Sequence, residues 1–178
     1  MHKFAKYLRR FLFSLFPTLS IGDIEFLRSH LSKQEQILFY RMPRFDQKHC
    51  INVAYAAEAL AQHTAKASQK MLVKVALLHD IGKVVDPPKL RFRVYAALYE
   101  MFLPFLANFL AKHGKKPKSS RLARSLYIKK EHGPIGTELL KELNWGEGPL
   151  FLIAHHHDAP QDKELPELTI LRQADEEN

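Results

Sequence analysis

The chain has 178 residues, of which 46% are apolar, so it can bury the core of one globular domain, and an intrinsically disordered chain is excluded. Its 27 Lys and Arg outnumber 19 Asp and Glu, and the formal charge of +8 favours anionic partners such as phosphates, nucleotides or an acidic membrane surface. A single cysteine, Cys50, excludes a framework of internal disulfides, and no apolar run reaches the roughly 18 residues that a membrane-spanning helix needs.

The first predicted helix, over residues 2–16, is basic and amphipathic. Phe4, Leu8, Phe11 and Leu15 recur at helical spacing, and the lysines and arginines lie mostly on other faces. Such a helix can lie on an anionic membrane, and it can as easily cover the domain core with its aromatic face. We favour packing on the core in a cytoplasmic protein, with peripheral membrane contact through residues 2–16 as the alternative.

Two short helices are expected next, because capping residues mark where each begins. Ser20 or Asp23 can cap the first of them. Ser32 and Glu35 form a capping-box pattern that opens the second, and Pro43 follows its end.

We divide the chain into an N-terminal basic helix with a helical cap, residues 1–44, and a main domain, residues 45–178. In the main domain, turn signals such as Gly82 and Pro87-Pro88 separate helical stretches. Helices are expected over residues 46–62, 68–80, 89–111 with a kink at Pro104, 119–132, 134–143, 150–156 and 167–175. No segment shows the two-residue period of a strand, so the sequence predicts an all-α helical bundle.

Side chains that can bind a metal ion recur at the ends of apolar helical segments. His79 and Asp80 follow the apolar run 71–78, where an unpaired charge would be costly to bury and a metal ion would remove that cost. Each candidate alone could be an ordinary core or surface residue, but a bundle can point such groups inward from several helices at once. Imidazoles and carboxylates together suit Fe, Mn, Co, Ni or Zn better than Ca. The candidate ligands are His49, His79, Asp80, His132, His155, His156, His157 and Asp175.

The order of these residues resembles the HD-domain superfamily of metal-dependent phosphohydrolases, in its HDIG branch. Members carry a His, a His-Asp pair and a final Asp in this order, which matches His49, His79-Asp80 and Asp175. HDIG members continue as His-Asp-Ile-Gly-Lys, and residues 79–83 are identical to that motif. The resemblance implies an all-α HD-type helical bundle over residues 45–178, with two divalent transition-metal ions, drawn from Fe, Mn, Co, Ni or Zn, as cofactors.

By the same resemblance, Asp80 would bridge the two metal ions. His132 and two residues of the triplet 155–157 would bind the second ion, and the triplet can be aligned in more than one register. We favour His155 and His156, because Asp158 then falls where related members have an acidic residue. The other ligands of the first ion would be His49, His79 and Asp175.

The resemblance implies hydrolysis of a phosphate ester, and the positive charge of the chain favours a small phosphorylated substrate, most simply a nucleotide. Asp80 and Lys83 would be the catalytic residues, and Lys83, Arg41 and Arg44 would bind the phosphate. Lys83 can also be explained as a cation that interacts favourably with a helix C-terminus. Lys129 and Lys130, beside His132, are weaker candidates for phosphate binding.

Other functions fit the same ligand set, since some HD-domain proteins are di-iron oxygenases and a non-catalytic sensor or scaffold can be built on the fold. The cyclic-dinucleotide branch has a Gly-Tyr-Pro signature after its His pair, whereas this chain has Asp158-Ala159-Pro160-Gln161, which argues against hydrolysis of cyclic di-GMP. No motif of a nucleic-acid-binding protein is present, so no specific nucleic-acid binding is expected.

Overall fold

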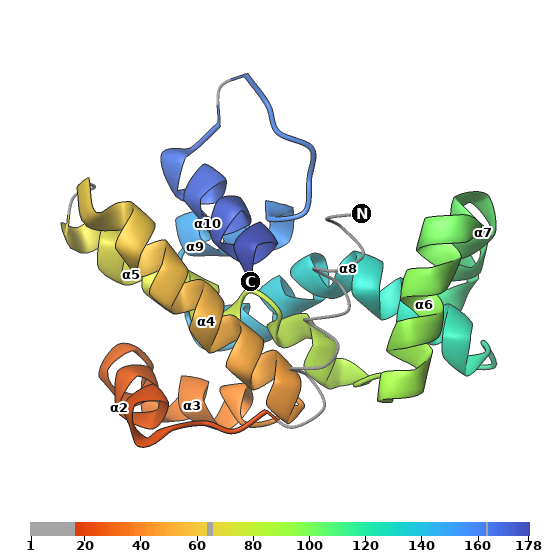
Figure 1. Ribbon diagram of the computed structural model, residues 1–178, viewed down its shortest axis with the longest axis horizontal. Helices are drawn as coiled ribbons and strands as arrows, with labels where there is room; N and C mark the ends of the chain where they lie inside the picture. Colours follow the sequence, from red (N-terminus) through yellow and green to blue (C-terminus); the bar gives the residue numbers. More distant parts are fainter. Residues whose placement is uncertain (1–16, 64–65, 163) are drawn as a thin grey trace.

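The chain folds as a bundle of helices in this computed structural model, which describes residues 17–63, 66–162 and 164–178 (Figure 1). None of the described residues forms a strand, which confirms the all-α prediction. The helix predicted over residues 2–16 lies outside the described residues, so its packing and its membrane contact stay predictions. The described elements, with η for a 3₁₀ helix, are α2 (Ile21–His30), α3 (Lys33–Phe39), α4 (Arg44–Leu60), η1 (Ala61–His63), α5 (Lys66–Leu78), η2 (Ile81–Val85), α6 (Leu90–Phe102), α7 (Pro104–Gly114), α8 (Arg121–Lys141), α9 (Glu147–His155) and α10 (Pro166–Glu177).

The first two of these helices begin where their capping residues predict. At the start of α2, the Ser20 hydroxyl accepts a hydrogen bond from the Asp23 N–H at 3.1 Å, and the Asp23 carboxylate accepts one from the Ser20 N–H at 2.8 Å. Ser32 and Glu35 repeat this reciprocal pattern at the start of α3. Each capping box satisfies two backbone donors that would otherwise be unpaired at a helix N-terminus, which explains where both helices begin.

The main core lies between α4 and α5 and is closed by α2, α3, α9 and α10. Leu27 and Phe39, which precede residue 44, are completely buried in the same cluster as Val53, Leu77 and Leu171 from three later helices. Burial of a side chain of this size contributes about 1.5–3 kcal/mol to folding. The helices before residue 44 therefore share a core with those after it, and the division at that residue stays a prediction.

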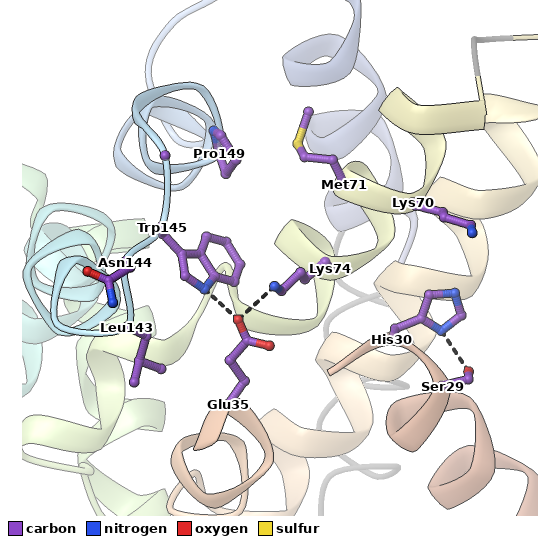
Figure 2. Close-up of a pocket in the computed structure, with 11 residues that line it drawn as sticks. Ser29, His30, Glu35, Lys70, Met71, Lys74, Leu143, Asn144, Trp145 and Pro149 are labelled. Carbon is purple, nitrogen blue, oxygen red and sulfur yellow. Dashed lines mark hydrogen bonds and ion pairs between the residues drawn. The ribbon is translucent and has the colours of Figure 1, made fainter. Parts of the chain in front are cut away.

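A buried carboxylate, Glu35, joins α3 to α5 and to the turn between α8 and α9 (Figure 2). Its Oε1 accepts hydrogen bonds from the Trp145 indole N–H at 2.6 Å and from the Lys74 ammonium at 2.7 Å. Its Oε2 accepts one from the Ser32 N–H at 2.8 Å. The Lys74 ammonium also lies 5.0 Å from the centre of the Trp145 ring, a cation–π distance. Protein donors alone thus satisfy both oxygens of this carboxylate.

The aromatic-rich stretch 89–111 contributes to two helices rather than to one kinked helix, so that prediction is wrong. α6 ends at Phe102 and α7 begins at Pro104, with non-helical backbone angles at Leu103 between them. A proline disfavours helical angles in the residue before it, whereas its missing N–H is harmless at the first position of a new helix. The two helices pack on α8 and lie at one end of the molecule, at the right of Figure 1.

The two helices predicted on either side of Pro134 are a single helix, α8, so the predicted break is also wrong. A proline inside a helix removes a hydrogen bond and costs about 3 kcal/mol. Packing on both sides of the proline offsets this cost, because Gly133 lies against the backbone of α9 and Gly136 against η2. As a result, His132 lies in the middle of a helix rather than at its end.

Candidate metal centre

Five parts of the chain bring most of the predicted ligands together. His49 lies in α4, and the pair His79-Asp80 forms the turn between α5 and η2. His132 comes from the middle of α8, the triplet 155–157 from the end of α9, and Asp175 from α10. These elements pack directly on one another, so side chains that are far apart in the sequence converge.

Two glycines let these elements approach closely enough. A Cβ atom on Gly82 would lie 2.0 Å from the carbonyl oxygen of His132, so only glycine allows η2 to pack on α8 at this point. A Cβ atom on Gly133 would lie 2.7 Å from the carbonyl oxygen of Ile153, which sets the approach of α9 in the same way. The Gly in the His-Asp-Ile-Gly-Lys sequence therefore has a packing role, because it allows Asp80 to reach His132.

The first ligand cluster consists of His49, His79 and Asp175, whose ligand atoms lie within 4.8 Å of one another. His49 Nε2 is 2.9 Å from Asp175 Oδ1, and His79 Nε2 is 3.7 Å from the same oxygen. Asp80 borders this cluster, with its Oδ2 at 3.9 Å from His49 Nε2 and its Oδ1 at 3.8 Å from His79 Nε2. Two imidazoles and two carboxylates thus face one small space.

The second ligand cluster consists of Asp80, His132, His156 and His157, whose ligand atoms also lie within 4.8 Å of one another. His132 Nε2 is 3.0 Å from Asp80 Oδ1. The same nitrogen is 3.2 Å from His156 Nε2 and 3.1 Å from His157 Nε2. Asp80 therefore lies within reach of both clusters, which is where a bridging carboxylate would have to be.

Backbone hydrogen bonds determine which nitrogen of three histidines faces the clusters. Nδ1 of His79, His132 and His156 each lies 2.7 or 2.8 Å from a backbone carbonyl oxygen three residues earlier. A carbonyl oxygen only accepts, so Nδ1 carries the proton and Nε2 of a neutral ring holds a lone pair. Two such lone pairs at 3.2 Å repel each other, and a cation between them would turn that repulsion into binding. Support of Nδ1–H by a carbonyl is also usual for metal-binding histidines.

His79 gives the sharpest test of whether these residues fit a metal ion. Its buried Nε2 has no hydrogen-bond partner, and the nearby carboxylate oxygens are 3.7 and 3.8 Å away. Burial works against a positive charge on His79, yet the nearby carboxylates of Asp80 and Asp175 raise the pKa of the ring well above its usual value. Surroundings that favour a proton on Nε2 also favour a metal ion in its place, and the ion would give this atom a partner. The residues therefore fit a metal ion.

The charges of the other ligands also suit a cation. Burial works against ionisation of Asp80 and Asp175, but Lys83 and neighbouring histidines hold the pKa of Asp80 well below its usual range, and the nearby His49 and His79 do the same for Asp175. Burial and then neighbouring imidazoles lower the pKa of His156 well below its usual value and that of His157 to about 4. Near neutral pH the two carboxylates are therefore ionised, and the two imidazoles are neutral and able to offer a lone pair.

The geometry favours one register of the His triplet. His155 belongs to neither cluster, and its Nδ1 lies 2.6 Å from Asp158 Oδ2 at the surface. His155 is the last residue of α9 and shares a face with exposed Phe151 four residues earlier, whose ring centre is 4.4 Å from its own. The turn after α9 instead places His157 beside His132. The structure thus brings His156 and His157 into the second cluster, whereas the sequence favoured His155 and His156, so the choice of ligand pair stays a prediction.

Arg172 of α10 holds this turn, a role that the sequence alone did not indicate. Its guanidinium donates hydrogen bonds to the carbonyl oxygen of His155 at 2.9 Å and to that of His156 at 3.2 Å, and it pairs with Glu164. These carbonyls lie 17 and 16 residues earlier in the chain, so no local pattern could have marked the arginine.

Cys50 adjoins the clusters but is a poor candidate ligand. It is completely buried and forms a third group of ligand-type atoms with His79 and Asp80. Burial raises the pKa of its thiol, and a protonated thiol is a weak ligand. Cys50 therefore serves as a small buried residue of the core.

Both clusters contribute to the wall of a cavity of about 560 Å³, a volume typical of sites for small organic ligands. Residues of the clusters that line it are His49, Asp80, His132, His157 and Asp175. The rest of the wall is partly basic and partly apolar, and its residues are Lys83, Glu100, Pro104, Ala107, Asn108, Ala111, Leu126, Lys129, Lys130 and Asp158.

The structure separates the predicted phosphate-binding residues into two groups. Lys83 lines the cavity, with its Nζ 2.5 Å from Asp80 Oδ2. Arg41 and Arg44 do not line it, although they precede the helix that carries His49 closely in the sequence. Lys129 and Lys130 line it instead, because they lie within one turn of His132 on α8. Proximity to His132 along α8 was thus the better predictor of which basic residues line the cavity.

Comparisons with known proteins address the same residues. A family model described as "HD domain" matches residues 47–177, which is well over half of the chain and includes both clusters. A search of curated proteins and a search of solved structures each gave no match.

Proposed function

This chain belongs to the HD domain family, whose members are generally metal-dependent phosphohydrolases, and we propose that it is an HDIG-type enzyme that hydrolyses small phosphate esters at a dinuclear site. The observation that carries the proposal is the convergence of two ligand clusters on Asp80. The Nε2 of His79, which has no hydrogen-bond partner, and the approach of His132 Nε2 to His156 Nε2 at 3.2 Å support it, because a cation would interact favourably with both.

Each cluster would bind one divalent ion, with Asp80 as the bridge. His49, His79 and Asp175 would complete the first site, and His132, His156 and His157 the second. Imidazole and carboxylate ligands suit Fe, Mn, Co, Ni or Zn. When bound, such ions would activate water and stabilise negative charge on the phosphoryl oxygens.

Lys83 is the residue of this chain best placed to bind the phosphate. An ammonium group has three N–H donors, and Asp80 Oδ2 uses one of them at 2.5 Å. The others are available to a phosphate oxygen in the cavity that Lys83 lines. Lys130 adds positive charge to the same wall, which favours an anionic group there, whereas Lys129 is paired with Glu100.

The remaining wall of the cavity suits the organic part of a nucleotide. Pro104, Ala107, Ala111 and Leu126 offer apolar contact for a base, and the Asn108 amide offers both a donor and an acceptor. A phosphate at the clusters and a base near α7 would use both kinds of surface. Nucleotides are therefore the substrate class that we favour among phosphate esters.

The test combines metal analysis of freshly purified protein with a panel of phosphomonoesters and phosphodiesters under Mn(II), Fe(II) or Co(II), with and without oxygen. We expect two ions per chain and hydrolysis that does not require oxygen. A protein that retains its ions, hydrolyses no ester and consumes oxygen with a hydroxylated substrate would instead be a di-iron oxygenase. A protein purified without metal and inactive after metal addition would fit a sensor or scaffold.

A further inference from the structure

α6 and α7 turn their large apolar side chains away from the protein. The buried apolar side chains of these helices are small, namely Ala96, Ala107 and Ala111, which pack with Leu126 of α8, while Tyr99 and Leu110 are only partly buried against them. A surface helix normally turns its large apolar residues toward the core, so this arrangement is the reverse of what folding alone favours. The exposed side chains, which we call the α6–α7 patch, are Tyr95, Leu98, Met101, Phe102, Leu103, Phe105, Leu106 and Phe109.

Exposure in the α6–α7 patch is greatest around the connection between the two helices. Phe105 is 91% exposed, Phe102 is 69% exposed and Phe109 is 59% exposed. Phe105 and Phe109 are four residues apart on α7, so they are neighbours on one face of that helix. Several large apolar side chains gathered at one end of a protein mark a surface that contacts something else.

Basic residues follow the apolar stripe of α7. Lys112 lies three residues after Phe109 on the same face, and the exposed lysines 115, 116 and 118 come directly after the helix. Exposed Lys89 and Arg91 lie at the start of α6. Between residues 89 and 121 the sequence contains one acidic residue, Glu100, which is paired with Lys129. The hairpin thus combines an apolar end with a cationic end.

We propose that the α6–α7 patch docks this protein on the surface of an anionic phospholipid bilayer. The aromatic side chains would enter the membrane interface while the lysines contact anionic headgroups, as in interfacial amphipathic helices. α6 has 13 residues and α7 has 11, which is too short to span the hydrocarbon layer. No helix in the described part of the chain is long and apolar enough to cross a membrane.

Charge favours a bilayer over a second copy of this chain as the occupant of the patch. The chain carries a formal charge of +8, and two copies meeting at this surface would bring the same lysines together. An anionic bilayer is complementary to that charge. Pro104, Asn108 and Ala111 on another side of α7 line the cavity of the metal centre, so docking would hold that cavity near the membrane, but docking itself does not depend on the proposed reaction.

The experiment is flotation of the full chain with vesicles of phosphatidylcholine alone or of phosphatidylcholine mixed with phosphatidylglycerol. We expect binding to the mixed vesicles that weakens as salt is added, because salt screens the lysine–headgroup attraction. Phe105→Ser should lower the partition coefficient by about tenfold or more. The matched control is Ile21→Ser on α2, where the side chain is 78% exposed, and it should bind as wild type does.

A second variant tests the cationic end of the hairpin. Lys115→Ser combined with Lys116→Ser should lower binding by about fivefold per charge removed and make it less sensitive to salt. The proposal is overturned if Phe105→Ser binds as wild type does, which would assign any binding to another segment such as residues 1–16. It is also overturned if the chain does not bind anionic vesicles, or if it forms a dimer in solution that Phe105→Ser dissociates.

Discussion

Glu35 and Asp80 are both buried carboxylates surrounded by nitrogen-containing side chains, but only the surroundings of Glu35 are fully hydrogen-bonded within the protein. At the α3 junction, Glu35 receives hydrogen bonds from Ser32, Lys74 and Trp145, so both of its oxygens have partners within the protein (Figure 2). At the metal centre, Asp80 faces imidazoles whose own lone pairs point at one another, and Nε2 of His79 has no hydrogen-bond partner.

The difference teaches how to separate structural from functional polar clusters. Buried polar groups in folded proteins are almost always hydrogen-bonded, because an unsatisfied one costs about 1–3 kcal/mol. The Glu35 cluster obeys this rule with protein groups alone, so it needs no ligand. At the candidate metal centre, His79 Nε2 breaks this rule and a bound cation would restore it, so we attribute the polarity of the centre to binding rather than to folding.

The largest expected effect is loss of metal on removal of the shared carboxylate. Asp80→Ala should lose most of both ions, and activity should fall by well over the roughly 100-fold that follows loss of an outer hydrogen-bond partner of a metal ligand. Elemental analysis and turnover of the best substrate in the panel check this. Glu35→Gln is the matched control, since it changes an equally buried acid outside the centre and should keep both ions. Full metal occupancy in Asp80→Ala would show that the centre has another role.

The next effect separates the two registers of the His triplet. His157→Ala should lose mainly one of the two ions, because His157 lies beside His132 in the second cluster. His155→Ala should keep both ions, because His155 pairs with Asp158 at the surface. Metal content measured in parallel for the two variants decides the matter. The opposite result would restore the pair His155 and His156.

The sequence predicted which helices carry the candidate ligands, but it did not predict which two histidines of the triplet lie in the second cluster. His49, His79, Asp80 and Asp175 follow regular helical segments, so their order alone placed them on converging helices. The triplet lies where α9 ends. The backbone there is held by hydrogen bonds from Arg172 of α10, which comes 16 or 17 residues later in the sequence. A sequence pattern cannot resolve a register that depends on such a contact.

The same limit explains the errors in the fold. Capping boxes are local, and they predicted the starts of α2 and α3 correctly. Pro104 and Pro134 both looked like interruptions, yet one begins a helix and the other lies inside one. What distinguishes them is the packing of Gly133 against α9 and of Gly136 against η2. These contacts are between helices, so the local sequence around each proline does not predict them.

A smaller effect is expected at Lys83, which contacts the metal centre without belonging to either cluster. Lys83→Ala should lower kcat/KM by about tenfold to 100-fold, because a charge-assisted hydrogen bond to phosphate is worth roughly 1.5–3 kcal/mol. Metal content should remain at the wild-type level, which separates this variant from Asp80→Ala. Loss of both ions in Lys83→Ala would mean that the ammonium group holds Asp80 in place rather than binding substrate.

The smallest expected effect is on folding stability, and it tests the Glu35 cluster. Glu35→Gln removes the charge that faces Lys74 but leaves an acceptor for Trp145, so we expect a loss of about 1–2 kcal/mol in the free energy of unfolding at neutral pH. Urea denaturation followed by circular dichroism measures this loss. If Glu35→Gln is as stable as wild type but binds less metal, then the Glu35 cluster contributes to metal binding rather than to folding.

The pH dependence of the stability lost in Glu35→Gln gives a second test of the Glu35 cluster. Burial works against the charge of Glu35, but Lys74 and the Ser32 backbone lower its pKa below the ordinary value. Because the folded pKa is below the unfolded one, the carboxylate contributes its full stability above the unfolded pKa, and that contribution is lost as pH falls through the folded pKa. Gln does not titrate, so the gap in unfolding free energy between wild type and Glu35→Gln should be constant near neutral pH and should shrink below about pH 4. The acids of the metal centre are present in both proteins, so their titration cancels in the difference. A gap that widens on acidification would mean that Glu35 is protonated in the folded protein.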